Sequence, residues 1–117
     1  MFIGIDLHTN CFSCCYLDTQ GNKEHKKFKL EDNDLDQFYK TLSQNCYVLI
    51  EATINTFAFQ ALFQDKVKQV FIANTYKLKS ISFTDTKTDT VDAEKLARIL
   101  KMQIMSSEEQ IHPVIVI

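Results

Sequence analysis

Four acidic residues have the types and spacing of a possible reaction centre: Asp6, Glu51, Asp89 and Asp92. Asp6 stands inside an apolar, strand-like run, where aspartate is depleted. Glu51 ends the apolar run YVLI, and ligands of open α/β sheets collect at such carboxyl ends of strands. Asp89 and Asp92 are three residues apart at the expected start of a helix, so they lie on one of its faces.

Four carboxylates in one place repel one another, and some would hold protons at neutral pH unless a cation compensated them. Magnesium and manganese ions prefer oxygen ligands and keep positions for water and substrate phosphate. Two such ions roughly 4 Å apart can activate a nucleophile and stabilise a leaving oxygen in phosphodiester chemistry. The four acids therefore predict a site for Mg²⁺ (or Mn²⁺), without indicating a particular substrate.

Each acid also has an ordinary structural explanation. Asp89 can cap the helix, and Asp92 can be favoured by the helix dipole. Glu51 can be a solvated residue at a strand end, and Asp6 a hydrogen-bonded acid within a strand. Residue types and spacing alone leave these alternatives open.

The elements that must position the acids follow from the apolar pattern. Strands are expected at 2–9, 11–18, 23–30, 47–53 and 68–74, with a hairpin in which Gly21 and Asn22 supply positive φ angles. Helices are expected within 31–45, 54–66 and 86–100. This β-β-β-α-β-α-β-α order is that of the ribonuclease H-like (RuvC-like) fold, an α/β class with a mixed five-stranded sheet.

Helical spacing also predicts which residues face the core. Asn33 or Asp34 is the expected N-cap of the first helix. The residues expected to face inward are Leu35, Phe38, Tyr39 and Leu42 in the first helix, Phe57, Phe59, Ala61 and Leu62 in the second, and Ala93, Leu96, Ala97 and Leu100 in the third. In the third helix, Glu94, Lys95, Arg98 and Lys101 form the expected charged back.

Composition limits the classes of protein that remain. The 117 residues suit one domain, and no apolar run approaches the roughly 20 residues of a membrane span. The start MFIGIDLH lacks the features of a secretion signal, so we predict a cytoplasmic protein. His8, Cys11, Cys14 and Cys46 suggest a zinc site, but buried reduced thiols are favoured because Cys11 and Cys14 would point to opposite faces of a strand.

The net charge of −2 gives no overall basic field, but lysines gather in two places. One stretch contains Lys23, Lys26, Lys27 and Lys29, and the other contains Lys77, Lys79 and Lys87. Each is either a solvated surface or a contact for nucleic-acid phosphates. The second group forms our candidate nucleic-acid-binding set.

The segments FIGIDLHTNCFSCCYLD, IEATINTFAF and KTDTVDAEKLARIL resemble the N-terminal domain of the DEDD insertion-sequence transposases, which include the Piv-type invertases. The similarity covers about residues 2–103. It implies that Asp6, Glu51, Asp89 and Asp92 are the four acids of the family's tetrad, which bind Mg²⁺ for DNA strand cleavage and exchange.

The resemblance also implies partners and a domain plan. Its partners are DNA, at the element ends and the target, and a structured guide RNA that pairs with both. The full-length protein is expected to be a homo-oligomer. Residues 1–103 would form the RuvC-like catalytic domain, and 104–117 the truncated start of a connection to an absent C-terminal domain whose serine takes part in cutting. We therefore expect that the chain does not transpose DNA by itself.

Two alternatives stay open. FIGIDLHTN is also similar to the phosphate-binding hairpin of the actin, sugar-kinase and chaperone ATPases. The chain could instead be a nucleic-acid-binding module with a degenerate site. His8 lies on the strand face of Asp6 by period two, and a turn or packing role is favoured for it over a role in the site.

Overall fold

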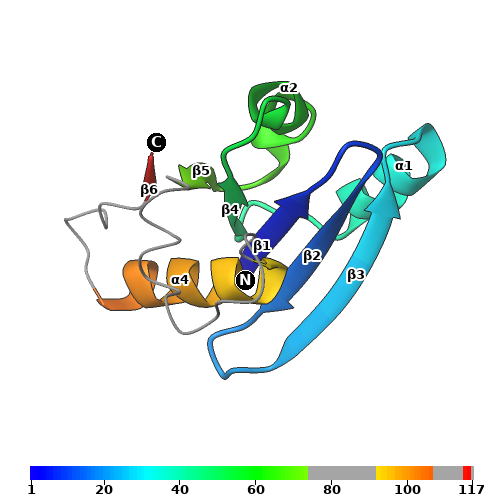
Figure 1. Ribbon diagram of the computed structural model, residues 1–117. Coiled ribbons are helices and arrows are strands. Elements are labelled where there is room, and N and C mark those ends of the chain that lie inside the picture. The colour runs from blue at the N-terminus through cyan, green and yellow to red at the C-terminus, as the bar shows by residue number, and fades with distance from the viewer. Residues whose placement is uncertain (74–91, 107–114, 117) are drawn as a thin grey trace.

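The computed structural model describes residues 1–73, 92–106 and 115–116. Its centre is a six-stranded mixed sheet with helices packed on it (Figure 1). The strands, in the spatial order β3-β2-β1-β4-β5-β6, are β1 Phe2–Leu7, β2 Cys11–Leu17, β3 Lys23–Lys29, β4 Tyr47–Glu51, β5 Gln69–Ala73 and β6 Ile115–Val116. β1, β4 and β5 run parallel, whereas β2, β3 and β6 pair antiparallel with their neighbours. The α/β, ribonuclease H-like class is confirmed.

The five strands expected from the sequence are all present. The two-residue β6 extends the sheet by pairing antiparallel with β5, so that Ile115 stands opposite Ala73. The division of the chain at residue 103 stays a prediction, and the last described helix continues past that point to Ser106.

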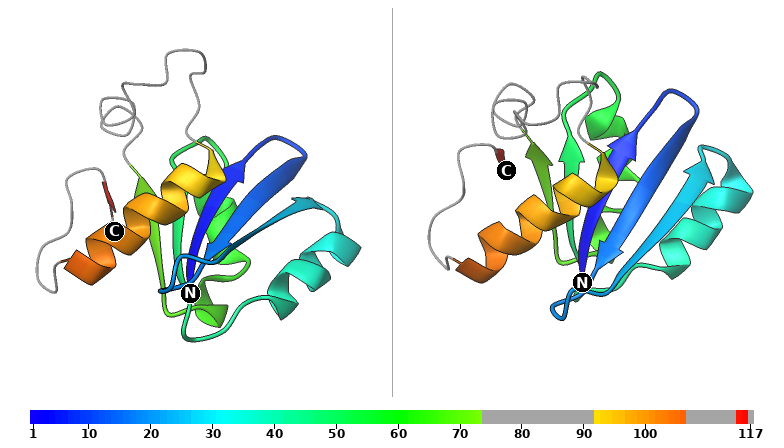
Figure 2. Two further views of the ribbon diagram at one scale, coloured as in Figure 1. Left: turned by 90° about the horizontal axis from the view of Figure 1, so that it is seen from below. Right: turned by 60° about the horizontal axis from the view of Figure 1, so that its bottom comes forward.

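Helices cover both faces of the sheet. The α1 helix (Asp32–Lys40), the short α2 helix (Thr56–Ala61) and a 3₁₀ turn (Gln64–Lys66) lie on one face, and α4 (Ala93–Ser106) crosses the other (Figures 1 and 2). Each side has its own apolar core, because alternate strand residues point to opposite faces. No helix among the described residues is long and apolar enough to cross a membrane.

Gly4 lets α4 lie directly against β1. A Cβ atom at this position would overlap the Ala93 carbonyl oxygen and would lie 2.5 Å from the Ala97 nitrogen. The apolar stripe of α4 faces the sheet as expected, with Ala93, Leu96, Ala97 and Leu100 all buried. The first turn of the helix is thereby held over the middle of β1.

The β2–β3 hairpin forms where the sequence predicts it. Gly21 has a φ of 93°, and the Asp18 carboxylate accepts backbone hydrogen bonds from Gln20 and Asn22, each at 2.9 Å. The expectation of a positive φ at Asn22 is wrong, because no described residue other than glycine has one. The Asp18 side chain closes the turn, so Asn22 does not need that conformation.

The start of α1 differs from the expectation. Glu31 is the N-cap and makes no side-chain capping hydrogen bond, so the assignment of Asn33 or Asp34 is wrong. Asp34 lies within the helix, and its carboxylate accepts the Lys29 backbone N–H at 2.7 Å. The side chain thus binds the end of β3 and not its own helix.

The inward face of α2 also differs. Phe57 is 73% exposed and Leu62 is 43% exposed, whereas Phe59 and Phe63 are buried. Ala61 is exposed as well. The expected inward positions for Phe57, Ala61 and Leu62 are therefore wrong. The reason is that the expected long helix is a six-residue helix followed by a 3₁₀ turn, so a single 3.6-residue period does not continue through the segment.

Candidate active site at the carboxyl edge of the sheet

Asp6 lies near the end of β1 and faces the side of the sheet that α4 covers. Phe2 packs in the core beneath α4, and alternation places Gly4 and Asp6 on the same face. The Asp6 side chain is 17% exposed, and its Oδ2 lies 3.0 Å from Nε2 of His8. His8 therefore contacts a predicted site residue, although the sequence favours a turn or packing role for it.

Glu51 occupies the corresponding position on the neighbouring strand. The parallel register pairs Gly4 with Leu49 and Ile5 with Ile50, so Glu51 and Asp6 are the next residues on the two strands. Leu49 packs in the core on the α4 side, and alternation directs Glu51 to that side too. The two carboxylates are therefore level with each other on one face.

Thr56 holds the chain just beyond Glu51. Its hydroxyl donates to the Glu51 carbonyl at 3.2 Å and accepts the Thr53 backbone N–H at 2.7 Å. The Thr56 residue is only 1% exposed, the one buried polar residue among the described parts of the chain. This hydroxyl, which the sequence pattern does not single out, fixes the turn that leads away from the acid.

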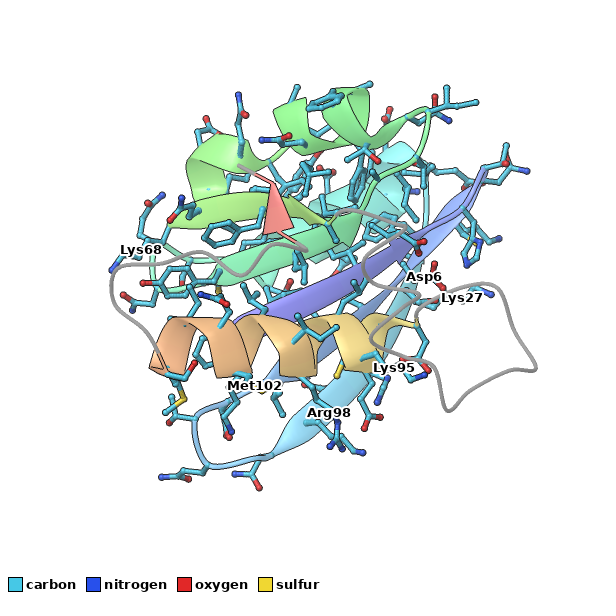
Figure 3. The ribbon with its side chains drawn as sticks, turned by 60° about the vertical axis from the view of Figure 1, so that its left-hand side comes forward. Asp6, Lys27, Lys68, Lys95, Arg98 and Met102 are labelled. Atoms are coloured by element: carbon cyan, nitrogen blue, oxygen red, sulfur yellow. The ribbon has the colours of Figure 1, made fainter. Side chains whose placement is uncertain are left out.

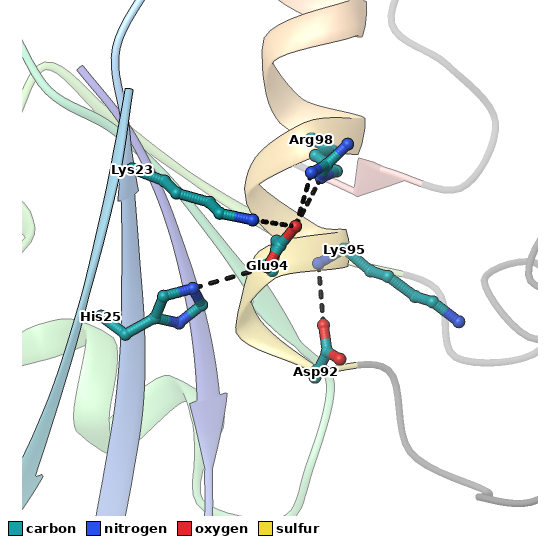
Figure 4. Close-up of polar contacts among 6 residues, drawn as sticks. All are labelled: Lys23, His25, Asp92, Glu94, Lys95 and Arg98. Carbon is teal, nitrogen blue, oxygen red and sulfur yellow. Dashed lines mark hydrogen bonds and ion pairs between the residues drawn. The ribbon is translucent and has the colours of Figure 1, made fainter. Parts of the chain in front are cut away.

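Asp92 is the N-cap of α4. Its Oδ1 accepts the Lys95 backbone N–H at 2.9 Å (Figure 4). Its carbonyl accepts the Leu96 N–H at 3.1 Å. The sequence offers Asp89 as the cap of this helix, whereas in the structure α4 begins at Ala93 and Asp92 caps it. Asp89 lies outside the described residues.

The close contact at Gly4 brings the start of α4 to the same edge. Ala93 lies over Gly4, Asp92 precedes Ala93, and Asp6 follows Gly4 by two residues on the strand. Figure 3 shows Asp6 beside the first turn of α4. Three of the four predicted acids thus lie at one edge of the sheet, on one face.

The donor chemistry of this edge suits a hard divalent cation, since carboxylate oxygens are the ligands that Mg²⁺ and Mn²⁺ prefer. Within residues 1–73, 92–106 and 115–116, no three His, Cys, Asp or Glu side chains are close enough to hold a metal ion. Asp92 uses one carboxylate oxygen to cap α4. The residue types at this edge therefore suit a hard cation, but the described side chains do not come close enough together to hold one by themselves.

Comparison with known families decides the assignment. The family model of the IS110-type DEDD transposases, described as a transposase, matches residues 3–112. The chain belongs to this family. No curated protein matches it. The matched residues of this transposase domain include all four predicted acids.

Glu94 of the transposase domain joins α4 to β3. One carboxylate oxygen accepts hydrogen bonds from Lys23 Nζ at 3.0 Å and Arg98 Nε at 2.9 Å, and the other lies 3.4 Å from His25 Nε2 (Figure 4). The hydrogen bonds from Lys23 and Arg98 lower the pKa of Glu94. The sequence places Glu94 on a charged outer face, whereas the side chain is 27% exposed and fastens the helix to the sheet.

The lysines of β3 divide between the two faces of the sheet. Lys23, Lys27 and Lys29 alternate with Lys26 and Phe28, and Phe28 is buried beneath α1. The three lysines of the candidate nucleic-acid-binding set, Lys77, Lys79 and Lys87, lie outside the described residues.

The cysteines of the transposase domain do not form the alternative zinc site. All four are free, and no metal-binding group of three occurs among the described residues, which include His8 and every cysteine. Cys14 is buried, and this burial raises the pKa of its thiol to about 12. Cys15 and Cys46 are buried too, as expected, whereas Cys11 is half-buried.

Proposed function

We propose that this domain is the metal-binding catalytic part of a transposase that acts in phosphodiester cleavage and strand exchange in DNA, with Mg²⁺ (or Mn²⁺) bound by Asp6, Glu51, Asp89 and Asp92. The observation that carries the proposal is the shared edge: two acids stand level on neighbouring parallel strands, and a third precedes the helix packed on Gly4. Membership of the transposase family supports this reading over the ATPase alternative, whose hairpin resemblance involves only the first strands.

Each residue has a defined part in the proposal. Asp6 and Glu51 hold the cation from the sheet, and Asp92 holds it from the N-terminal end of α4. Bound divalent ions supply a polarised nucleophile and stabilise the leaving oxygen of the phosphodiester. Thr56 keeps the end of β4 in place through the Glu51 carbonyl, and His8 orients the Asp6 carboxylate through its 3.0 Å contact.

The partners follow from transposition. We propose DNA as the substrate, a structured guide RNA as an additional partner, and a homo-oligomer as the state of the full-length protein. Residues 1–103 would be the catalytic unit, with strand exchange depending on a further domain.

Manganese calorimetry tests the metal site. Asp6→Asn and Asp92→Asn each remove one negative charge, and asparagine at position 92 retains the ability to cap α4. Asp36→Asn is the matched control, because Asp36 is exposed on α1, on the other face of the sheet. We expect both site variants to lose at least the 10- to 100-fold in affinity that changes around a metal ligand cause, while the control binds as the wild type does.

Two further measurements address the alternatives. Nucleic-acid binding that is indifferent to metal and to loss of the acids would favour the degenerate binding module. A rise in melting temperature with ATP, without a rise with manganese alone, would favour the ATPase. Equal manganese isotherms for the wild type, Asp6→Asn and Asp92→Asn would contradict the proposed function.

A further inference from the structure

The pleat of β3 separates its basic residues into groups with different surroundings. Lys23 and His25 face α4 and are engaged by Glu94. Lys26 points to the opposite face and lies 3.6 Å from Glu24. Lys27 and Lys29 share the α4 face, are exposed, and form no ion pair with another described residue.

These two lysines lie in line with the acid edge. The sheet register pairs Asp6 with Ser13, and Ser13 with Lys27, so the three residues form one row across β1, β2 and β3 on one face. Lys29 stands in the next row, opposite Cys11. With strands about 4.8 Å apart, the backbones of Asp6 and Lys27 are roughly 10 Å apart. Figure 3 shows the two side chains on the same side of the molecule.

α4 leaves this part of the sheet face open. On β2, Cys15 and Leu17 are buried in the core beneath α4, whereas Ser13 and Cys11 on the same face are only half-buried. The helix begins at Ala93, over Gly4, so α4 does not cover the rows beyond it. The open area therefore begins where the acid edge is.

A cleft continues from this open area to the β1–β2 turn. It has a volume of about 570 Å³, and its lining includes Thr9, Asn10, Cys11, Lys27 and Lys29. The two ammonium groups are its cationic lining groups, and the remaining lining residues are Leu30 and Glu31. With two cations, a hydroxyl and an amide against the single carboxylate of Glu31, this lining suits a phosphate chain better than an apolar ligand.

We propose that Lys27 and Lys29 bind backbone phosphates of the substrate DNA strand next to the phosphodiester that is cut. This inference rests on the proposed function, because the acid edge defines where the reacting phosphate lies. A DNA strand that extends from the acid edge along the open sheet face passes the row of Ser13 and Lys27. The lysines offset the repulsion between the acids and a polyanion, and they read no base sequence.

The test measures the affinity of the 117-residue chain for single-stranded DNA as a function of salt, in EDTA so that metal plays no part. Lys27→Gln/Lys29→Gln is compared with the wild type and with Lys26→Gln/Lys40→Gln. The control has the same change in net charge on exposed residues that face the α1 side. Unchanged thermal melting of both double variants establishes that they are folded.

Each phosphate contact contributes about 0.7 to the slope of log K against log salt for a single strand. We expect the slope for Lys27→Gln/Lys29→Gln to be smaller by about 1.4, and the control to keep the wild-type slope. Equal slopes for the two double variants, or a wild type without salt-dependent binding, would overturn the proposal. A loss confined to RNA of the same sequence would overturn the assignment to DNA, whereas equal losses with DNA and RNA support backbone recognition.

The two proposals can fail separately. Lys27→Gln/Lys29→Gln is expected to bind manganese as the wild type does, since neither lysine belongs to the acid set. A normal DNA slope in this variant, together with loss of manganese binding in Asp6→Asn, would leave the metal site standing and remove only the phosphate contact.

Discussion

Replacing Gly4 with alanine tests whether the close packing of α4 on β1 holds the acid edge together. The added Cβ would overlap the Ala93 carbonyl oxygen and would approach Ala97 N to 2.5 Å and Leu96 Cβ to 2.8 Å. Two of these three neighbours are backbone atoms, so relief requires movement of the helix and not of a flexible side chain. Displacement of a packed element by 0.5–1 Å forfeits about a quarter to a half of its dispersion contacts.

Overpacking of a core usually costs about 1–3 kcal/mol, and a clash with backbone belongs at or above the upper end of that range. We expect Gly4→Ala to lower the free energy of unfolding in urea by about 3 kcal/mol or more. Because Asp92 directly precedes the displaced helix, the manganese affinity of any folded Gly4→Ala protein should fall as well.

Gly21→Ala is the matched control, because its added Cβ meets no atom within 4 Å while its φ of +93° disfavours alanine. The strain of this conformation costs about 1–2 kcal/mol and leaves α4 in place. We expect a smaller loss of stability and unchanged manganese binding. Wild-type stability and metal affinity in Gly4→Ala would refute the reasoning, as would equal effects of the two substitutions on metal binding.

Three other predictions concern single side chains. Thr56→Val should lower the free energy of unfolding by about 1–2 kcal/mol, because it removes the buried hydroxyl that accepts the Thr53 N–H and donates to the Glu51 carbonyl, and Thr56→Ser should restore most of the loss in urea titrations. Glu94→Gln should cost at most about 1 kcal/mol at neutral pH. Because folding lowers the Glu94 pKa, the stabilisation from the Glu94 carboxylate is complete above the ordinary glutamate pKa and is lost as the pH falls through the lowered pKa. A stability difference between wild type and Glu94→Gln that grows in acid would contradict this. Iodoacetamide at pH 8 should label Cys11 before Cys14, whose pKa is raised to about 12 by burial, and mass spectrometry showing the reverse order would be contrary to the structure.

Local pattern predicts the parts of the fold whose period is regular. The four apolar residues of α4 are at helical spacing over a 14-residue helix, and all four face the sheet. The pattern misleads in α2, where Phe59 and Phe63 are buried in place of Phe57 and Leu62. A six-residue helix and a 3₁₀ turn have different periods, and contact with the aromatic core decides which side faces inward.

The candidate site is predictable to the extent that it follows from the fold. The level positions of Asp6 and Glu51 require only that β1 and β4 be parallel neighbours, which the order of elements implies. The role of Glu94 is not predictable in this way, since its partner Lys23 is 71 residues distant in the sequence. The spacing of polar residues along α4 shows that the helix has a polar face, but it does not show which strand lies opposite that face.

The same distinction applies to the lysines of β3. The sequence shows one basic stretch, but the pleat gives Lys23 and Lys26 acidic neighbours and leaves Lys27 and Lys29 beside the acid edge. The face of each lysine follows from strand alternation. The position of Asp6 in the same row follows only from the register of three strands.

The most direct test of the central claim is an anomalous diffraction map of a manganese-soaked crystal of this transposase domain. We expect a peak about 2.1 Å from carboxylate oxygens of Asp6 and Glu51, with an acid from the start of α4 completing the ligands. A manganese peak elsewhere, or Asp6 and Glu51 without bound metal under saturating conditions, would contradict it.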